Sequence, residues 1–330
     1  MAKLNVTIAS EAYDRIEAIR DGRVSIEGCD VNYLTVGPEE LFFRAYRNNE
    51  FDICELSMSS YLMSLARGDN AYVAIPVFLS RQFRHNAIYI RTDRGIQSPG
   101  DLVGRKVGVP EYQVTAALWV RAFLDQSFGV PPSALSWFHG GLHEPGRVEK
   151  VTLKLPSSIS YAGIGADETL DGLLARGDLD ALVSPRPPRC YFDRSAPVLR
   201  LFENHRAVEE EYFRHTGIFP IMHVVGIRKS LVQANPWLAN SVFEAFERSK
   251  KIALEHLRDT AAFKVTLPWL SANLAEAEAV MGQDFWPYGV EANLTTLRAM
   301  LDFGWRHGTL SRQLDLQEIF VPSTRERFKV

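Results

Sequence analysis

The sequence predicts an α/β protein built from two lobes, and three features of the 330-residue chain support this prediction. Segments with strand-like and helix-like patterns alternate from the N-terminus, which is typical of a mostly parallel sheet. Residues 98–110, SPGDLVGRKVGVP, read as a turn, a short helical start and a strand that open a second lobe. Residues 217–228, GIFPIMHVVGIR, form an apolar strand pattern through which we expect the chain to return to the first lobe.

The first lobe is predicted over residues 1–91 and again over 204–330. Its expected strands are residues 4–9, 31–36, 51–55, 72–78 and 87–91. Six helices are expected in this lobe. The first ends at Arg20, the second begins at Pro38, the third ends at Gly68, and the fourth follows Asn235-Pro236-Trp237. The last two are expected over residues 274–281 and 290–303. Proline followed by acids at residue 38, and asparagine followed by proline at residue 235, are typical helix starts.

The second lobe is predicted over residues 92–203. Its expected strands are 106–109, 135–138 and 181–184, and its expected helices are 115–128 and 169–176. The chain contains no internal repeat, low-complexity tract or flexible linker. We therefore expect strand-like crossovers between the lobes, with a hinge and a cleft between them.

Composition narrows the functional classes. Lys and Arg number 37 and Asp and Glu number 40, giving a net charge of −3, so no global field attracts nucleic acid or an anionic membrane. Three cysteines, Cys29, Cys54 and Cys190, are too few and too scattered for a disulfide framework or a thiolate metal site. No apolar run approaches the roughly 20 residues that span a bilayer. Because MAKLNVTIAS lacks the pattern of a secretory signal, we expect a cytoplasmic protein.

Spaced landmarks along nearly the whole chain resemble one family. They are SPGDLVGRKVGVP at 98–110, Tyr13-Asp14-Arg15, FDICELS at 51–57, Phe83-Arg84-His85, residues 217–225, Asn235-Pro236-Trp237 and WPYGV at 286–290. Together they are similar to the 4,5-dihydroxyphthalate decarboxylase family, enzymes of aromatic degradation on the fold of type II periplasmic binding proteins. The resemblance implies a carboxy-lyase that converts 4,5-dihydroxyphthalate to 3,4-dihydroxybenzoate (protocatechuate) and CO2.

The densest polar cluster contains Arg81, Arg84 and His85, between two predicted strands. An aromatic dicarboxylate requires donors that hold each carboxylate with two parallel hydrogen bonds, and arginine supplies that fork. Arg186 follows the strand at 181–184, and α/β sheets bind ligands beyond such strand ends. The alternative is that these arginines lie in solvated loops and face water.

Histidine suits proton delivery to the ring, because its unperturbed pKa lies near neutrality. His85 and His223 are the candidate donors, and His223 has the alternative of a hydrogen-bonded core histidine in an apolar strand. Glu55, at the end of the third strand, is expected to bind the ring hydroxyls or to orient a histidine; a salt bridge to Arg15 or a helix cap is the alternative. The remaining substrate-binding candidates follow strand ends or begin a helix, and they are Tyr13, Arg15, Ser57, Tyr112 and Thr115.

We expect no organic cofactor and no metal, with a divalent ion left open. His139 and His143 have ligand-like spacing, but the glycines between them argue against a helix, so a loop over the cleft is expected instead. The expected partner is a small aromatic dicarboxylate, and a homo-oligomer is left open. The alternative function is a non-catalytic solute-binding protein on the same fold, which would require an export signal, and another enzyme on this fold is a third hypothesis.

Overall fold

The structure is a computed structural model that describes residues 3–149, 151 and 153–325. By its internal contacts the chain divides into two compact units. Unit 1 comprises Met1–Arg81, Ile221–Arg298 and Leu314–Val330, and unit 2 comprises Gln82–Pro220 and Ala299–Gln313. The lobes predicted from the sequence change at residues 91 and 203, whereas the units change at 81 and 220. The difference arises because the strands near residues 90 and 200 pair within the unit 2 sheet.

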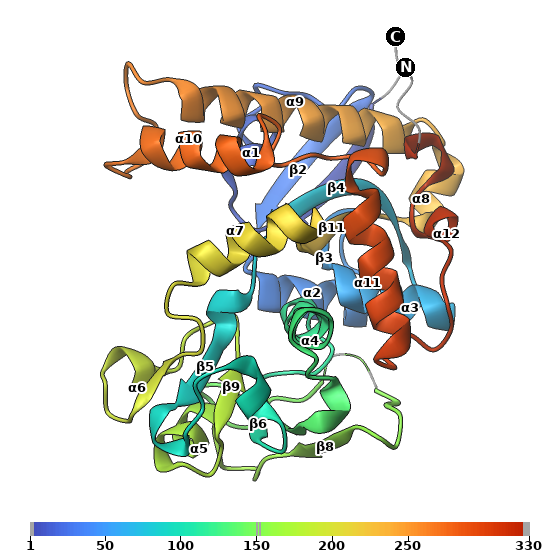
Figure 1. The fold of residues 1–330 in the computed structure, drawn as a ribbon. Coiled ribbons are helices and arrows are strands. Elements are labelled where there is room, and N and C mark those ends of the chain that lie inside the picture. The colour runs from blue at the N-terminus through green and yellow to red at the C-terminus, as the bar shows by residue number, and fades with distance from the viewer. Residues whose placement is uncertain (1–2, 150, 152, 326–330) are drawn as a thin grey trace. The chain divides into compact units, whose positions relative to one another are not determined.

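Unit 1 is built on a five-stranded sheet in the order β2-β1-β3-β11-β4 (Figure 1). Its strands are β1 (Leu4–Ser10), β2 (Cys29–Thr35), β3 (Ile53–Ser57), β4 (Tyr72–Arg81) and β11 (Ile221–Arg228). Strand β1 pairs in parallel with β2 and β3, while β11 is antiparallel to both β3 and β4. One end of this sheet therefore contains the carboxyl ends of β1, β3 and β4 and the beginning of β11.

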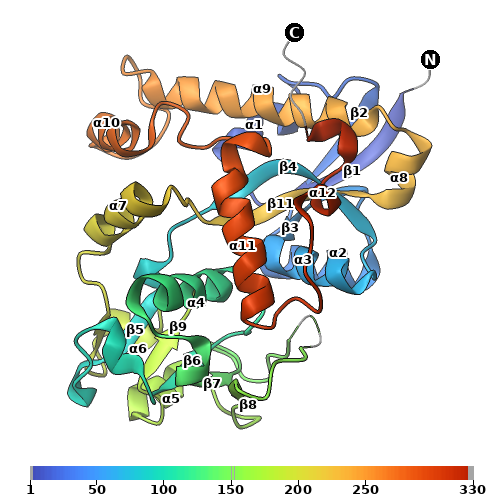
Figure 2. The same cartoon turned by 45° about the vertical axis from the view of Figure 1, so that its right-hand side comes forward.

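The helices of unit 1 pack against its sheet or against one another. They are α1 (Asp14–Arg20), α2 (Pro38–Asn48), α3 (Met58–Arg67), α8 (Lys229–Ala234), α9 (Leu238–Arg258), α10 (Leu270–Met281), the first part of α11 (Leu294–Arg306) and α12 (Leu316–Ile319). Helix α1 packs against α9, the longest helix, as both cartoon views show (Figure 2). The buried residues of α9 include Leu238, Val242 and Phe246, whose spacing of about four gives the helix its apolar stripe.

Unit 2 is built on a six-stranded sheet in the order β10-β5-β9-β6-β7-β8. Its strands are β5 (Ile88–Arg91), β6 (Lys106–Val109), β7 (Ser136–His139), β8 (Ser160–Gly163), β9 (Ala181–Val183) and β10 (Val198–Arg200). Its helices are α4 (Thr115–Phe128), α5 (Leu170–Arg176), α6 (Arg189–Phe192), α7 (His205–Thr216) and the last part of α11. Helices α4 and α5 lie on opposite faces of the sheet (Figure 2). A cluster with Leu170, Leu174 and Leu182 at its centre fills the α5 side.

The structure confirms the α/β class, and most predicted elements lie within one to four residues of their expected bounds. The helix predicted after Asn235-Pro236-Trp237 is confirmed as α9, which begins at Leu238. The capping role expected of Asn235 was wrong, because Asn235 ends α8, where its side chain donates to the Leu231 carbonyl. Helix α7 was not predicted, because of its residues only Tyr212 is buried and the sequence shows no apolar stripe. Within the described residues, no helix has the length and apolar character needed to cross a membrane. The three cysteines are buried and reduced.

Candidate active site

Polar residues gather where the unit 1 strands end at their common edge. Tyr13 follows β1, Glu55 lies in β3, and His223 lies near the start of β11. In the antiparallel pairing of β3 with β11, Glu55 lies opposite Val225 and Ser57 lies opposite His223. Residues two apart on one strand share a face, so Glu55 and His223 are diagonal neighbours on the same face of the sheet. This pairing brings together two residues that are far apart in the sequence.

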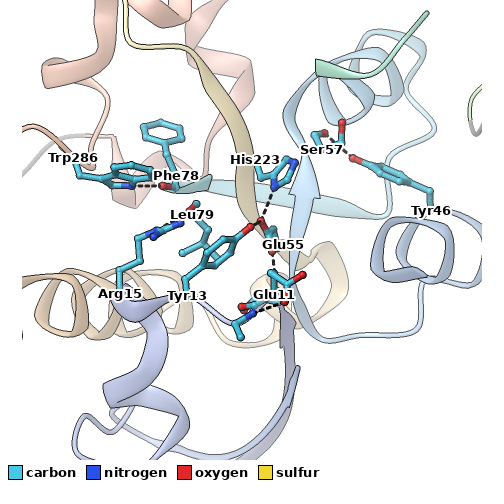
Figure 3. A network of polar contacts seen from close by, with 12 residues as sticks. Glu11, Tyr13, Arg15, Tyr46, Glu55, Ser57, Phe78, Leu79, His223 and Trp286 are labelled. Carbon is cyan, nitrogen blue, oxygen red and sulfur yellow. Dashed lines mark hydrogen bonds and ion pairs between the residues drawn. The ribbon is translucent and has the colours of Figure 1, made fainter. Parts of the chain in front are cut away.

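Glu55 and His223 form a short ion pair (Figure 3). Nδ1 of His223 lies 2.6 Å from Oε1 of Glu55. The hydroxyl of Tyr13 donates to the same oxygen at 2.6 Å, and the backbone N–H of Glu11 donates to Oε2 at 3.0 Å. Both carboxylate oxygens are thus occupied within unit 1, which favours the role of orienting a histidine over that of binding a ring hydroxyl.

The electrostatics keep Glu55 ionised. Glu55 is only 1% exposed, and burial by itself raises the pKa of its carboxyl. The nearby His223, through its charge and its hydrogen bond, together with the Glu11 N–H and the Tyr13 hydroxyl, outweighs burial and holds that pKa below its ordinary value. Burial and the Glu55 charge raise the pKa of Tyr13, so its hydroxyl remains a neutral donor. An acceptor-only carboxylate fixes the imidazole with its Nδ1–H toward Glu55.

His223 keeps its second nitrogen available. Its side chain is 17% exposed, and the edge of its ring contacts Phe42 at a centroid distance of 4.8 Å. Among the residues that the structure describes, Nε2 makes no hydrogen bond. A protonated imidazole held in this way presents one N–H to Glu55 and the other, at Nε2, away from it. This is the geometry of a general acid with an orienting carboxylate.

Arg15 and Trp286 form one wall of the site (Figure 3). The Arg15 guanidinium lies between the rings of Tyr13 and Trp286, at 4.1 and 4.4 Å from their centroids. Its Nε donates to the Leu79 carbonyl at 2.7 Å, and the Trp286 indole donates to the Phe78 carbonyl at 2.9 Å. Sequence analysis identified Arg15 but not Trp286 as a site residue, although Trp286 begins the WPYGV landmark.

Two further predicted residues of unit 1 are engaged in the fold. Ser57 lies at the start of α3; its hydroxyl accepts from Ser60 at 3.2 Å, and its carbonyl accepts from Tyr46 at 2.9 Å. Arg81 is 6% exposed and donates from Nη1 to Oδ1 of Asn293 at 2.7 Å. Burial lowers the pKa of Arg81 to about 9. The bond from Arg81 to Asn293 anchors the segment before α11.

His85 lies in an aromatic cluster of unit 2. It is 1% exposed, and its ring stacks on Phe123 at 4.0 Å with Tyr212 5.2 Å away. Burial lowers the pKa of His85 to about 3, so the imidazole is neutral near pH 7. A neutral, enclosed histidine is a poor proton donor compared with the paired His223.

We therefore expect His85→Phe to retain activity. The phenyl ring preserves the stacking on Phe123, and kcat should stay within about threefold of the wild-type value. Steady-state kinetics on the variant and on the wild-type enzyme test this expectation. A loss of a hundredfold or more in a variant that melts normally would instead assign the proton transfer to His85.

The other predicted residues of unit 2 occupy varied surroundings. Arg84 is buried near Glu209. Burial raises the pKa of Glu209 to about 7, and the positive charge of Arg84 acts in the opposite direction. Arg186 is exposed, and its backbone N–H donates to the Ser184 hydroxyl at 3.3 Å. Tyr112 and Thr115 are buried around the start of α4.

His139 and His143 make separate contacts. His139 stacks on Tyr161 at 4.6 Å, and Nδ1 of His143 lies 3.5 Å from a carboxylate oxygen of Asp171. Within the described part of the chain, no group of three or more His, Cys, Asp or Glu side chains is arranged to hold a metal ion.

Solved structures define the class of the fold. The periplasmic sulfonate-binding protein SsuA of Methylobacillus flagellatus matches 98% of this chain and 93% of its own, with a TM-score of 0.55 and 16% identity. The aliphatic sulphonate-binding protein SsuA of Escherichia coli matches 98% and 99%, with a TM-score of 0.53 and 13% identity. The protein therefore has the two-lobe fold of periplasmic binding proteins.

Curated relatives define the family, although no family model matches the chain. The 4,5-dihydroxyphthalate decarboxylase of Comamonas testosteroni is 45% identical over 331 residues, which cover both chains completely. That of Pseudomonas putida is 47% identical over 214 residues, or 65% of this chain and 83% of its own. This chain belongs to the 4,5-dihydroxyphthalate decarboxylase family. It is an enzyme, a carboxy-lyase.

Proposed function

We propose that this enzyme converts 4,5-dihydroxyphthalate to 3,4-dihydroxybenzoate and CO2, with His223 as the acid that protonates the ring. The names of both relatives support the substrate. The 2.6 Å contact between His223 and the buried Glu55 supports the proton donor. The pair stands at the strand edge where open α/β sheets bind ligands.

The substrate itself can absorb the charge that the reaction creates. Each carboxylate of 4,5-dihydroxyphthalate has a hydroxyl para to it on the ring. A proton added to the carbon bearing the leaving carboxylate forms a C–H bond from the ring π electrons, and the para oxygen takes up the positive charge. The C–C bond to the carboxylate then breaks, its electron pair restores the aromatic ring, and CO2 leaves. One proton is consumed for each CO2 released.

His223 and Glu55 divide the work of proton delivery. The imidazolium donates its Nε2 proton to the ring carbon, and solvent returns a proton afterwards. Glu55 stabilises the imidazolium and holds its ring in place, and Tyr13 and the Glu11 N–H hold Glu55. A positioned acid of this kind contributes about 10²–10⁴-fold to the rate.

Arginine side chains are proposed to hold the substrate carboxylates. Arg186 is exposed and Arg84 is buried, both in unit 2, and each guanidinium can form the paired hydrogen bonds that a carboxylate accepts. Arg81 is bound to Asn293, which favours a structural role for it.

Removal of the Arg186 guanidinium should weaken substrate binding. We expect Arg186→Ala to raise KM for 4,5-dihydroxyphthalate by about tenfold or more, because one charge-assisted contact contributes roughly 1.5–3 kcal/mol. The exposed Arg189, changed to alanine, is the matched control and should leave KM unchanged. Equal KM values for Arg186→Ala and the wild-type enzyme would remove Arg186 from the binding site.

The activity is tested by incubating the purified protein with 4,5-dihydroxyphthalate. We expect CO2 and 3,4-dihydroxybenzoate in equal amounts, with and without a chelator. Phthalate, which lacks the para hydroxyls, should not be decarboxylated. Tight binding of 4,5-dihydroxyphthalate without turnover would overturn the proposal.

A further inference from the structure

A second buried polar cluster lies in unit 2, outside the Glu55–His223 site. It surrounds the loop between β6 and α4, and we call it the Glu149 cluster: Tyr112, Arg121, Glu149 and Tyr161. Glu149 is half-buried, and its Oε1 accepts from the backbone N–H of Tyr112 at 2.6 Å and from the Tyr161 hydroxyl. A carboxylate thus occupies the place before a helix start where backbone N–H groups bind anions.

The Glu149 carboxylate is poorly satisfied there. Its Oε2 is buried and has no hydrogen-bond partner within the described chain. Burial raises the pKa of Glu149 to about 7, although the Tyr161 hydroxyl and the backbone N–H groups of Tyr112 and Gln113 lower it. The buried Oε2 is therefore removed from water without a hydrogen bond in return.

Arg121, on α4, supplies the second observation. It is 1% exposed, its Nη1 donates to the Tyr112 carbonyl at 2.8 Å, and its guanidinium lies 3.7 Å above the Tyr112 ring. Its Nε and Nη2 are both buried without a hydrogen-bond partner in the described chain. These two N–H groups lie on the same side of the guanidinium and form the fork that grips a carboxylate. A buried charged fork without an acceptor indicates a missing ligand.

We propose that the Glu149 cluster is a carboxylate-binding site that Glu149 fills in the absence of ligand. An incoming carboxylate displaces Glu149 from the Tyr112 N–H and the Tyr161 hydroxyl and also engages the Arg121 fork. In the described chain Glu149 makes no hydrogen bond to that fork. This inference rests on the proposed function only for the class of ligand, an aromatic dicarboxylate.

The groups facing Glu149 decide how binding depends on pH. Tyr112, Tyr161 and Arg121 contact or surround it, and Glu111 lies nearby with its charge balanced by Arg147 at 2.6 Å. His139 stacks on Tyr161, and burial lowers its pKa, so it is neutral above pH 7. Glu149 is thus the group in the cluster that changes charge near neutrality. Protonation removes its competition, so a dicarboxylate should bind more tightly at pH 6 than at pH 8.

The test is calorimetric titration with phthalate, which carries both carboxylates but cannot react by the proposed mechanism. We compare the ratio of Kd at pH 8 to Kd at pH 6 in the two proteins. This ratio should be about tenfold larger for the wild-type enzyme than for Glu149→Gln, because a competing group with a pKa near 7 is largely ionised at pH 8. At pH 8, Glu149→Gln should bind phthalate about tenfold more tightly than the wild-type enzyme. Glu203→Gln, an exposed carboxylate of unit 2, is the matched control and should behave as wild type.

Arg121→Lys provides the second arm, because lysine keeps the charge but loses the fork. We expect it to weaken phthalate binding by about tenfold or more, with thermal melting as the check on folding. If this variant does not fold, the Glu149 arm decides. A phthalate Kd for Glu149→Gln equal to that of Glu203→Gln at both pH values would overturn the inference. Failure to turn over 4,5-dihydroxyphthalate, with these phthalate shifts present, would overturn only the proposed function.

Discussion

Replacement of His223 by asparagine should lower kcat by about 10²–10⁴-fold and change KM much less. The asparagine amide can still donate to Glu55, so the buried carboxylate keeps a partner and the fold is preserved. The variant lacks a nitrogen at the Nε2 position, and no group remains there to protonate the ring. Steady-state decarboxylation of 4,5-dihydroxyphthalate measures the loss.

The matched control for this variant is His215→Asn. His215 lies on α7 with 71% of its side chain exposed, where its Nδ1 contacts Glu211. We expect wild-type kcat for this control. A kcat for His223→Asn within about threefold of the wild-type value would show that another group delivers the proton.

Replacement of Glu55 by glutamine should lower kcat by about 10–10²-fold. Glutamine keeps the shape and an acceptor oxygen but loses the charge that stabilises the imidazolium. The loss should appear in kcat with KM much less changed, because Glu55 acts on the proton donor and not on the substrate. A purely structural role would change the melting temperature and KM as well. Glu244→Gln, an exposed position on α9, is the control and should keep the wild-type kcat and KM.

Glu55 should also make stability depend on pH. Its folded-state pKa lies below the ordinary value, so the ionised carboxylate stabilises the fold above about pH 4.5. This contribution is lost as pH falls through the folded-state pKa. The difference in unfolding free energy between wild type and Glu55→Gln should therefore be larger at pH 7 than at pH 3.5, as measured by urea unfolding. A difference that is the same at both pH values would contradict the assigned ion pair.

Most strands and helices could be predicted from the sequence because the apolar residues of each element are the ones that the fold buries. Helix α4 was predicted with its observed bounds, since its first ten residues are all buried and glycine follows its last residue. Strand β3, buried at every position, was equally clear. Short strands on the far side of unit 2, such as β8 with its partly exposed residues, carry too little apolar pattern to be recognised.

The candidate site was predictable in its position more than in its contacts. Glu55 and His223 could be identified from strand ends, but only the register of β3 with β11 shows that they meet. Arg81 and His85 were themselves predicted as a substrate-binding residue and a proton donor, yet Arg81 donates to Asn293 and His85 stacks on Phe123. These partners are distant in sequence, and no local pattern reveals them. The partnerless fork of Arg121 was likewise hidden within an apolar helix.

The central claim, that His223 donates a proton to the substrate ring, is tested most directly by chemical rescue. His223→Gly removes the imidazole, and the partial exposure of this side chain leaves a route for a small replacement. With 4,5-dihydroxyphthalate as substrate, we predict that kcat falls by at least about a hundredfold and rises again with added imidazolium, in proportion to its protonated fraction. A variant that decarboxylates at the wild-type rate, with or without imidazole, would contradict the account.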